Sequence, residues 1–225
     1  MLTSSFYVRH GKRWFDGFAA AGGLVLLSPL LLLAAISVKL DSRGSAFFLQ
    51  TRVGQAEKPF QIIKFRTMRS ATHSTDPLIT ASGDSRITQV GRWLRQTKID
   101  ELPQLWNVLR GEMSLVGPRP EVPKYTALYS RAQKQVFTVR PGITGPAAIA
   151  CVNEEELLAG QKDPESYYVN ALLPAKLEID LAYCRSMSFR NDALFIFGTF
   201  GKLAGVRRAP EDWVKVPPDR AVDPW

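Results

Sequence analysis

The chain has 225 residues, a formal net charge of +8 at pH 7, two cysteines and two histidines. Its length corresponds to one domain with enough material for a hydrophobic core. The cysteines form no Cys-x-x-Cys pair, so the composition argues against a disulfide framework, a zinc site and a Ser-His-Asp triad. Any bound metal should be a hard ion with oxygen ligands, and the positive charge suits phosphates, acidic lipid headgroups or nucleic acid.

The first recognisable segment is uncharged and runs from Gly17 to Val38. As a straight helix it would reach roughly 33 Å, enough to cross a bilayer. Ser28-Pro29 lies in its middle, where the proline removes a backbone hydrogen bond and bends a helix. Basic residues flank both ends, so the positive-inside rule gives no direction: Arg9, Lys12, Arg13, Lys39 and Arg43. A kinked span and a re-entrant helix, whose two ends stay on one side of the membrane, both fit.

The stretch from Phe47 to Met68 alternates like a strand, with Lys64 and Arg66 on one face. Two cations placed in this way can converge on a phosphate or a diphosphate. A half-exposed strand with a solvated basic face is the alternative. From Ser70 to Ser85 the chain is rich in Ser, Thr, Asp and Gly, which predicts a surface loop able to act as a lid.

A helix is predicted from Thr88 to Lys98, with Ile87, Val90 and Leu94 on its buried side. Arg95 is a candidate for the acidic site that follows, and a solvated helix arginine is the alternative.

The next segment combines a short helix with an acidic pair. Four apolar residues have helical spacing: Leu102, Leu105, Trp106 and Leu109. Pro103 suits the start of this helix and Gly111 the residue past its end. Asp100 and Glu101 therefore precede a helix N-terminus, where anions are stabilised. An ionised carboxylate beside a phosphate site is a nucleophile or a metal ligand, and an ordinary capping pair is the alternative.

Two proline-containing turns follow. In Gly117–Pro120, Pro118 and Pro120 stiffen the backbone on both sides of Arg119, whose guanidinium would lose little entropy on gripping a phosphate or a base edge. A solvated arginine in a Pro-rich loop is the alternative. The segment Arg140–Pro146 predicts a tight turn in which glycine lets a phosphate approach the backbone. Arg140 can be structural or face the ligand.

The C-terminal third is predicted to be helical. The acidic run 153–156 opens a helix, and the chain from Asp163 to Arg190 is amphipathic. Apolar residues crowd between Asp192 and Val206, which suits an interfacial helix or a buried core helix. The remaining tail, 207–225, is rich in proline and charge and is predicted to be flexible.

Four segments in this order resemble the bacterial sugar transferase family, the monotopic phosphoglycosyl transferases: Lys64–Met68, Asp100–Gln104, Gly117–Pro120 and Arg140–Gly145. The similarity runs from Lys12 to about Val206. It implies a helix-rich α+β enzyme on the cytoplasmic face of the bacterial inner membrane. The implied divisions are a membrane-associated segment at 1–45 with a re-entrant helix at about 17–38 broken at Ser28-Pro29, and a catalytic domain at 46–206. We expect the small form of the family, because no multi-span region precedes the catalytic part.

The resemblance also implies the chemistry. A sugar phosphate would pass from a UDP-sugar to a polyprenyl (undecaprenyl) phosphate, with membrane lipids as surroundings. Asp100 would attack phosphorus, expel UMP and hold Mg²⁺, and Glu101 would position the metal or manage protons. The implied substrate-binding residues are Lys64, Arg66, Arg95, Pro118, Arg119, Pro120 and Arg140.

The sequence departs from the family pattern after the second turn. In many relatives the strand there carries an arginine or lysine before an asparagine, whereas Ala148–Asn153 contains no cation. Two other functions are kept beside the transferase, the first because of this missing cation and the second because of the high pI of about 9.7 and the scattered basic residues. One is a non-catalytic membrane scaffold of glycan-assembly enzymes. The other is a membrane-anchored nucleic-acid-binding protein, which the absence of a nucleic-acid motif disfavours.

Overall fold

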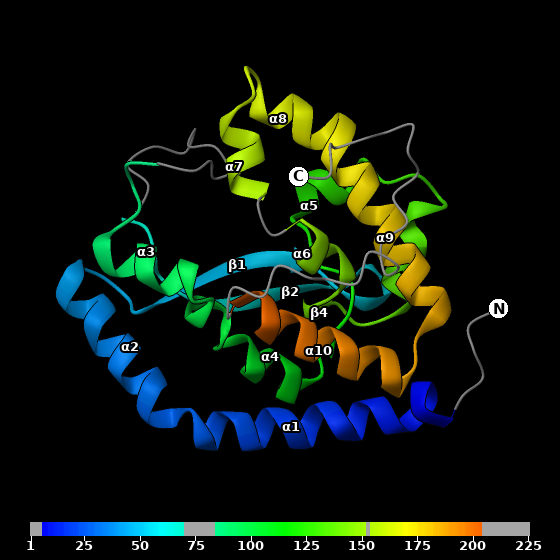
Figure 1. The fold of residues 1–225 in the computed structure, drawn as a ribbon, viewed down its shortest axis with the longest axis horizontal. Coiled ribbons are helices and arrows are strands. Elements are labelled where there is room, and N and C mark those ends of the chain that lie inside the picture. The colour runs from blue at the N-terminus through cyan, green and yellow to red at the C-terminus, as the bar shows by residue number, and fades with distance from the viewer. Residues whose placement is uncertain (1–5, 70–83, 152–153, 204–225) are drawn as a thin grey trace.

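The computed structural model describes residues 6–69, 84–151 and 154–203, and it is helix-rich α+β as expected (Figure 1). A long antiparallel hairpin of β1 (Phe47–Val53) and β2 (Pro59–Phe65) crosses the middle of the molecule, with helices on both sides. The predicted lid from Ser70 lies almost wholly outside the described residues, as does the tail at 207–225.

The helices follow in chain order. They are α1 (Lys12–Leu26), α2 (Ser28–Asp41), α3 (Gln89–Gln96), α4 (Gln104–Arg110), α5 (Pro123–Thr126), α6 (Pro146–Ala150), α7 (Glu154–Ala159), α8 (Pro164–Tyr167), α9 (Leu173–Ser186) and α10 (Phe189–Leu203). Single π or 3₁₀ turns occupy Tyr7–Gly11, Gln55–Glu57, Ile99–Glu101, Gln133–Thr138 and Tyr168–Leu172.

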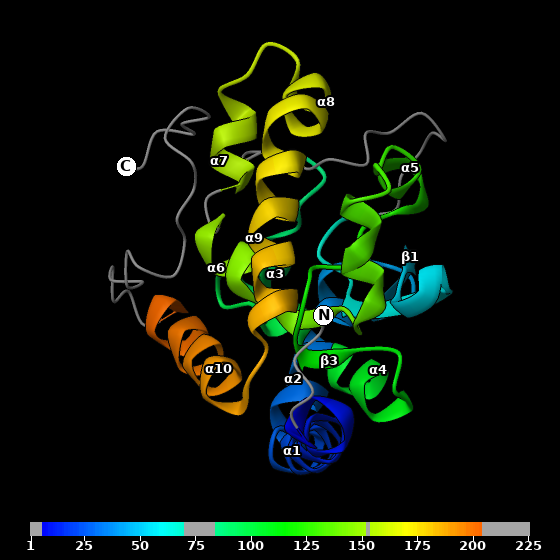
Figure 2. The ribbon, with the colours of Figure 1, turned by 90° about the vertical axis from the view of Figure 1, so that its right-hand side faces the viewer.

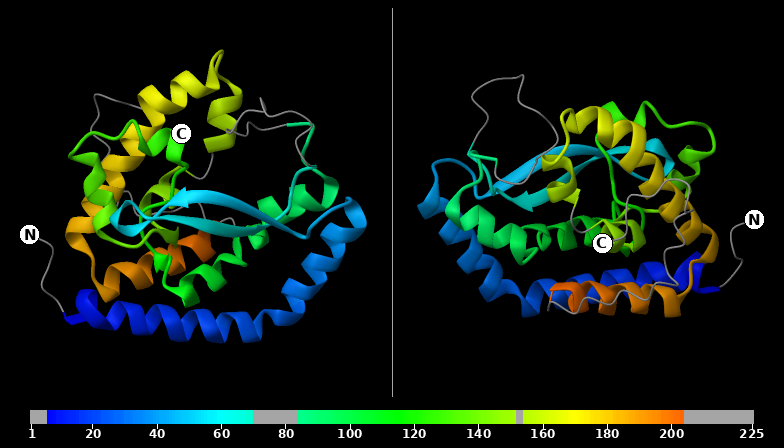
Figure 3. Two further views of the ribbon diagram at one scale, coloured as in Figure 1. Left: turned by 180° about the vertical axis from the view of Figure 1, so that it is seen from behind. Right: turned by 45° about the horizontal axis from the view of Figure 1, so that its top comes forward.

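The predicted break in the apolar segment is present: between α1 and α2 the helix axis bends by 63° away from a straight line (Figure 3, left). Pro29 has no N–H, so the carbonyl of Val25 loses its helical partner. The Ser28 hydroxyl donates to that same carbonyl at 2.8 Å. The Ser-Pro pair therefore bends the helix and satisfies the oxygen that the bend exposes, as a non-aqueous environment requires.

Within the part of the chain that the structure describes, no single helix is long and apolar enough to cross a membrane. The bent pair of Tyr7–Leu26 and Ser28–Asp41 reaches that length and composition when its two arms are taken together. This geometry fits a broken span or a re-entrant loop.

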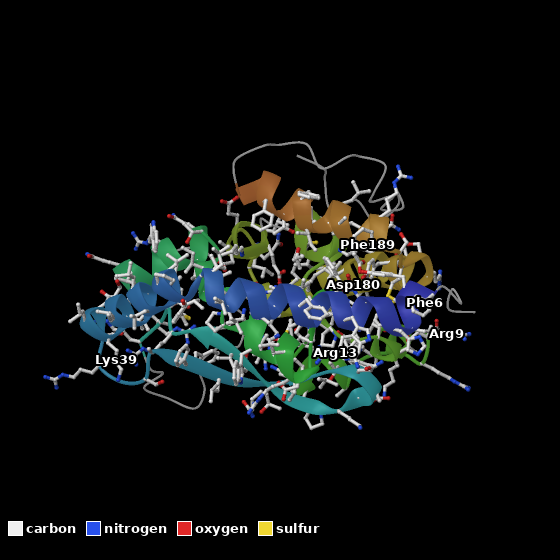
Figure 4. All side chains as sticks on the ribbon, turned by 90° about the horizontal axis from the view of Figure 1, so that it is seen from below. Phe6, Arg9, Arg13, Lys39, Asp180 and Phe189 are labelled. Carbon is white, nitrogen blue, oxygen red and sulfur yellow. The ribbon has the colours of Figure 1, made fainter. Side chains whose placement is uncertain are left out.

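The first arm lies along the protein body. Arg13 donates to the carbonyls of Val108 and Leu109 at the end of α4, at 2.7 and 2.8 Å. The buried carboxylate of Asp16 accepts from the Ser114 hydroxyl and the Leu115 N–H. Figures 2 and 4 show α1 running beneath the body with α4 on one side and α10 on the other.

We call the surface formed by α1, α4 and α10 the basal surface. Its helices expose large apolar side chains: Trp14, Phe18, Val25, Leu26, Trp106, Phe189, Phe197 and Phe200. Phe197 and Phe200 are 73% and 65% exposed, so α10 is a surface helix and not a buried core helix. Its buried Asp192 accepts from Lys12 and Tyr7, which ties α10 to the N-terminal arm.

Two short parallel strands, β3 (Ser114–Val116) and β4 (Gly142–Thr144), bring the two proline-containing turns together. The predicted turn at Arg140–Pro146 is therefore partly a strand. The expectation of a strand after this turn is wrong over 148–150, because the helix α6 covers Pro146–Ala150; residues 152 and 153 lie outside the described residues. A proline is favourable in the first turn of a helix, and three alanines follow it in α6.

Candidate active site

The acidic pair lies in a 3₁₀ turn, Ile99–Glu101, between α3 and α4. Thr88 caps α3 by accepting from the Gly91 N–H, and Lys98, at φ 56°, turns the chain sharply after that helix. The helix α4 was correctly predicted and ends at Gly111, whose φ of 81° suits glycine. Its start differs slightly, since α4 begins at Gln104.

No side chain caps α4, so the pair is not an ordinary helix cap. The helix is also short, and the pair precedes it by a separate turn. The electrostatics of the site are therefore set mainly by the nearby charges and by burial, and less by the helix dipole.

Glu101 is the centre of a charge cluster. Its Oε1 accepts from Lys64 Nζ at 2.7 Å and from an Arg119 terminal nitrogen at 2.8 Å. Both cations outweigh the effect of burial and hold the pKa of Glu101 well below its usual range. The carboxylate in turn raises the pKa of Arg119. Glu101 is therefore a permanent anion that fixes two cations side by side.

Asp100 has the opposite environment. Burial, followed by the negative charge of Glu101, raises the pKa of Asp100 to about 6. The carboxyl is only 8% exposed, and its Oδ1 has no hydrogen-bond partner in the described parts of the chain. The charges of Lys64, Lys98 and Arg95 favour the ionised form of Asp100. A carboxylate with an unused oxygen in such surroundings is suited to act as a nucleophile or as a ligand.

The other predicted cations have different partners. Arg66 follows the last residue of β2, and its guanidinium donates to the carbonyl and hydroxyl of Ser42 after α2. Arg95 pairs with Glu155 of α7, although its charge still lowers the pKa of Asp100. Arg140 donates to the carbonyl of Gly111, at the far end of α4. The structure brings Lys64 and Arg119 to the acidic pair and places Arg66 and Arg140 in structural contacts.

The backbone around Arg119 is fixed at three consecutive points. The Pro118 carbonyl accepts from the Gly142 N–H at 2.9 Å. The Arg119 N–H donates to Asp180 of α9 at 3.3 Å, and the Pro120 carbonyl accepts from Arg52 of β1 at 2.9 Å.

Sequence reasoning missed two of these partners. Asp180 lies in the amphipathic stretch beside Leu177 and Ile179, and a carboxylate at a buried helix position was the available signal. Arg52 gave no signal, because a strand arginine is usually solvated.

A magnesium ion could be held at this site by Asp100 together with phosphate oxygens of the substrate. Among the described residues, no group of three or more His, Cys, Asp and Glu side chains could hold a metal ion by itself. Mg²⁺ needs only one or two carboxylates when substrate phosphates complete its shell. The unpaired Oδ1 of Asp100 suits that arrangement.

Comparison with known proteins gives a consistent picture. The family model described as "Bacterial sugar transferase" matches residues 7–205. The UDP-glucose:undecaprenyl-phosphate glucose-1-phosphate transferase of Caulobacter vibrioides is 41% identical over 195 residues, which is 85% of this chain and 69% of that protein.

Two further relatives differ in length and in the sugar that their names give. The UDP-N-acetylgalactosamine-undecaprenyl-phosphate N-acetylgalactosaminephosphotransferase of Aeromonas hydrophila is 37% identical over 84% of this chain and 42% of its own length. The exopolysaccharide production protein PSS of Rhizobium leguminosarum bv. phaseoli is 38% identical over 84% of this chain and 92% of its own length. The chain thus spans less than half of the Aeromonas relative and nearly all of the Rhizobium one.

Proposed function

Because this chain belongs to the bacterial sugar transferase family, we propose that it transfers a sugar 1-phosphate from a UDP-sugar to undecaprenyl phosphate and releases UMP. This reaction would begin the assembly of a bacterial polysaccharide on its lipid carrier. The observation that supports it most directly is the contrast within the acidic pair: Glu101 is neutralised by Lys64 and Arg119, whereas Asp100 keeps a free oxygen.

The proposed reaction has two displacements at phosphorus. The Asp100 carboxylate attacks the sugar-bearing phosphorus of the donor, the bond from that phosphorus to the bridging oxygen breaks, and UMP leaves. The carboxylate now carries the sugar phosphate. An oxygen of undecaprenyl phosphate then attacks the same phosphorus, the acyl-phosphate bond breaks, and the carboxylate is regenerated. No oxidant or reductant is needed.

The cations beside Asp100 would stabilise the charge that develops on the diphosphate. Lys64 and Arg119 are fixed by a common carboxylate oxygen, so their positions are set before the substrate binds. Glu101 would act by holding these two cations. Mg²⁺, when bound to Asp100 and the substrate phosphates, would offset further negative charge.

We place the protein on the cytoplasmic face of the bacterial inner membrane, with α1 and α2 as a re-entrant pair. The lipid-linked acceptor requires access to a membrane. The 63° bend and the polar contacts that bind α1 along the body support an arrangement in which both arms enter from one side. The exposed apolar side chains of the basal surface would then contact acyl chains.

The test is a donor screen with the purified full chain in lipid nanodiscs, undecaprenyl phosphate and Mg²⁺. UMP release is measured for UDP-glucose, UDP-N-acetylgalactosamine and related donors, with the Asp100→Asn variant as the control. Release by the wild type with at least one donor, and none by the variant, supports the proposal. Absence of release with every donor would favour the non-catalytic scaffold.

A further inference from the structure

Arg119 supplies the only backbone donor in the segment Pro118–Pro120, because proline has no N–H. That N–H donates to the carboxylate of Asp180 on α9 (Figure 4). The contact joins residues 61 positions apart, so it is a tertiary contact and not a local turn. The guanidinium of the same Arg119 donates to Glu101 Oε1 at 2.8 Å.

Asp180 is in an unusual position for a carboxylate. It is 4% exposed and lines a small cavity together with Tyr129, Phe137 and Leu177. Its second oxygen, Oδ1, has no hydrogen-bond partner in the ranges that the structure describes. The Ala147 N–H at the start of α6 and the charge of Lys176 also favour the ionised form of Asp180. An incompletely paired buried carboxylate destabilises a protein, and an apolar side chain of similar size is often at least as stable there. Packing therefore does not explain the presence of an aspartate.

We propose that Asp180 is a positioning residue of the transferase, which holds the Arg119 backbone so that the guanidinium meets Glu101 beside the reacting phosphate. This inference rests on the proposed function. The carbonyls of Pro118 and Pro120 accept from Gly142 and Arg52. Without Asp180 these two hydrogen bonds would remain, but the Arg119 N–H between them would lose its acceptor. Rotation there would displace the guanidinium, and a displacement of about 1 Å can reduce a rate by about 10²-fold.

The experiment compares two substitutions in the full-length chain. Asp180→Leu keeps the number and branching of the side-chain heavy atoms and removes the acceptor, whereas Asp180→Asn keeps one acceptor oxygen for the Arg119 N–H. We expect kcat/KM for UMP release to fall about tenfold or more in Asp180→Leu and about threefold or less in Asp180→Asn. If Asp180→Leu does not fold, Asp180→Ala replaces it.

A double-mutant cycle distinguishes positioning from general support of the fold. If Asp180 acts through the guanidinium, adding Asp180→Leu to Arg119→Ala should cost less than about twofold beyond Arg119→Ala alone. A full additional tenfold loss would overturn the proposal, and so would wild-type activity in Asp180→Leu.

A second measurement does not depend on turnover. Hydrogen exchange at the Arg119 amide, located by fragmentation of its peptide, should be faster in Asp180→Leu than in the wild type, while the Gly142 amide stays protected. Unchanged exchange at Arg119 overturns the inference. If the wild type releases no UMP, the proposed function fails. The role of Asp180 in positioning Arg119 for catalysis then fails with it. The exchange result then reports only whether Asp180 anchors this backbone.

Discussion

Two neighbouring carboxyl groups, Asp100 and Glu101, differ in their surroundings more than in their chemistry. Glu101 accepts from two cations, and its pKa is lowered, whereas burial raises the pKa of Asp100 to about 6. Asymmetry of this kind separates roles in paired carboxylates. It supports our proposal that Asp100 reacts with the donor and that Glu101 positions the cations.

The first prediction tests this division with the exchange of labelled UMP into UDP-sugar in the absence of undecaprenyl phosphate. The wild type should show exchange, since a covalent half-reaction runs without the acceptor. Asp100→Asn should abolish it because an amide cannot form the acyl phosphate, whereas Glu101→Gln should retain slow exchange. Exchange that survives in Asp100→Asn would move the nucleophile elsewhere, and an active wild type without exchange would indicate direct transfer.

The second prediction concerns Arg119. Arg119→Ala should lower kcat/KM by about 10²-fold, the scale of one preorganised charge contact, with little change in the melting temperature because the guanidinium is partly exposed. Arg95→Ala is the matched control, since that arginine pairs with Glu155, and it should lose much less. Equal losses of kcat/KM in both variants would mean that Arg119 does not contact the substrate diphosphate in a preorganised position.

The third prediction uses the pH dependence of stability at Asp180. Burial raises the pKa of Asp180 to about 7, and the charge of Glu121 acts in the same direction. The N–H groups of Arg119 and Ala147 and the charge of Lys176 lower this pKa, but their effect is smaller. A raised pKa in the folded state gives a contribution that is present at low pH and lost as pH rises through about 7. Asp180→Asn should therefore gain stability relative to the wild type between pH 5 and pH 8. Parallel melting-temperature curves across this range would contradict the assignment.

At the level of secondary structure, the bend between α1 and α2 and the hydrogen bonds that hold α1 to α4 together set the direction of the helix pair. Ser28-Pro29 redirects the chain, and Arg13 then fixes the first arm by capping the carbonyls at the end of α4. Because only Leu102 and Pro103 separate the acidic pair from α4, the helix that Arg13 caps lies next to the site in the chain.

The fourth prediction is that both ends of the helix pair face the cytoplasm. In a variant without Cys151 and Cys184, single cysteines at Ser5 and Ser45 should resist a membrane-impermeant thiol reagent in intact cells. Both should react after the membrane is opened. Labelling of Ser5→Cys from the periplasm, with Ser45→Cys protected, would show a kinked span.

On the scale of the whole molecule, the helices of the basal surface lie side by side (Figure 4) and expose large apolar side chains, and α2 and β1 expose others. The fifth prediction is that Phe197→Glu with Phe200→Glu weakens binding of the detergent-free protein to anionic vesicles by about tenfold or more, because burial of two phenylalanines is lost. Leu128→Glu, which changes an apolar residue after α5 that is 58% exposed, is the control. Equal binding by the two proteins in a flotation assay would remove α10 from the membrane contact.

Local chemistry determined much of this protein. The bend at Ser28-Pro29, the helix that begins near Thr88 and the end of α4 before Gly111 could all be predicted, because each depends on residues within one or two turns. The family could be predicted from four short segments of the chain. The acidic pair was identified for the same reason, since its residues are adjacent in the chain. The strand expected after the second turn was wrong over 148–150, because Pro146 favours the first turn of a helix there.

Only the tertiary structure decided which cation meets which carboxylate. Lys64 and Glu101 are 37 positions apart, and Arg119 and Asp180 are 61 positions apart. No spacing rule connects such residues, so Arg66 and Arg140 looked as suitable as Lys64 and Arg119. The fold brings β2, the 3₁₀ turn and the Pro118–Pro120 segment to one point, and the end of β2 at Phe65 leaves Arg66 with Ser42 instead. Proximity in space, which sequence patterns do not encode, selects the two cations that contact Glu101.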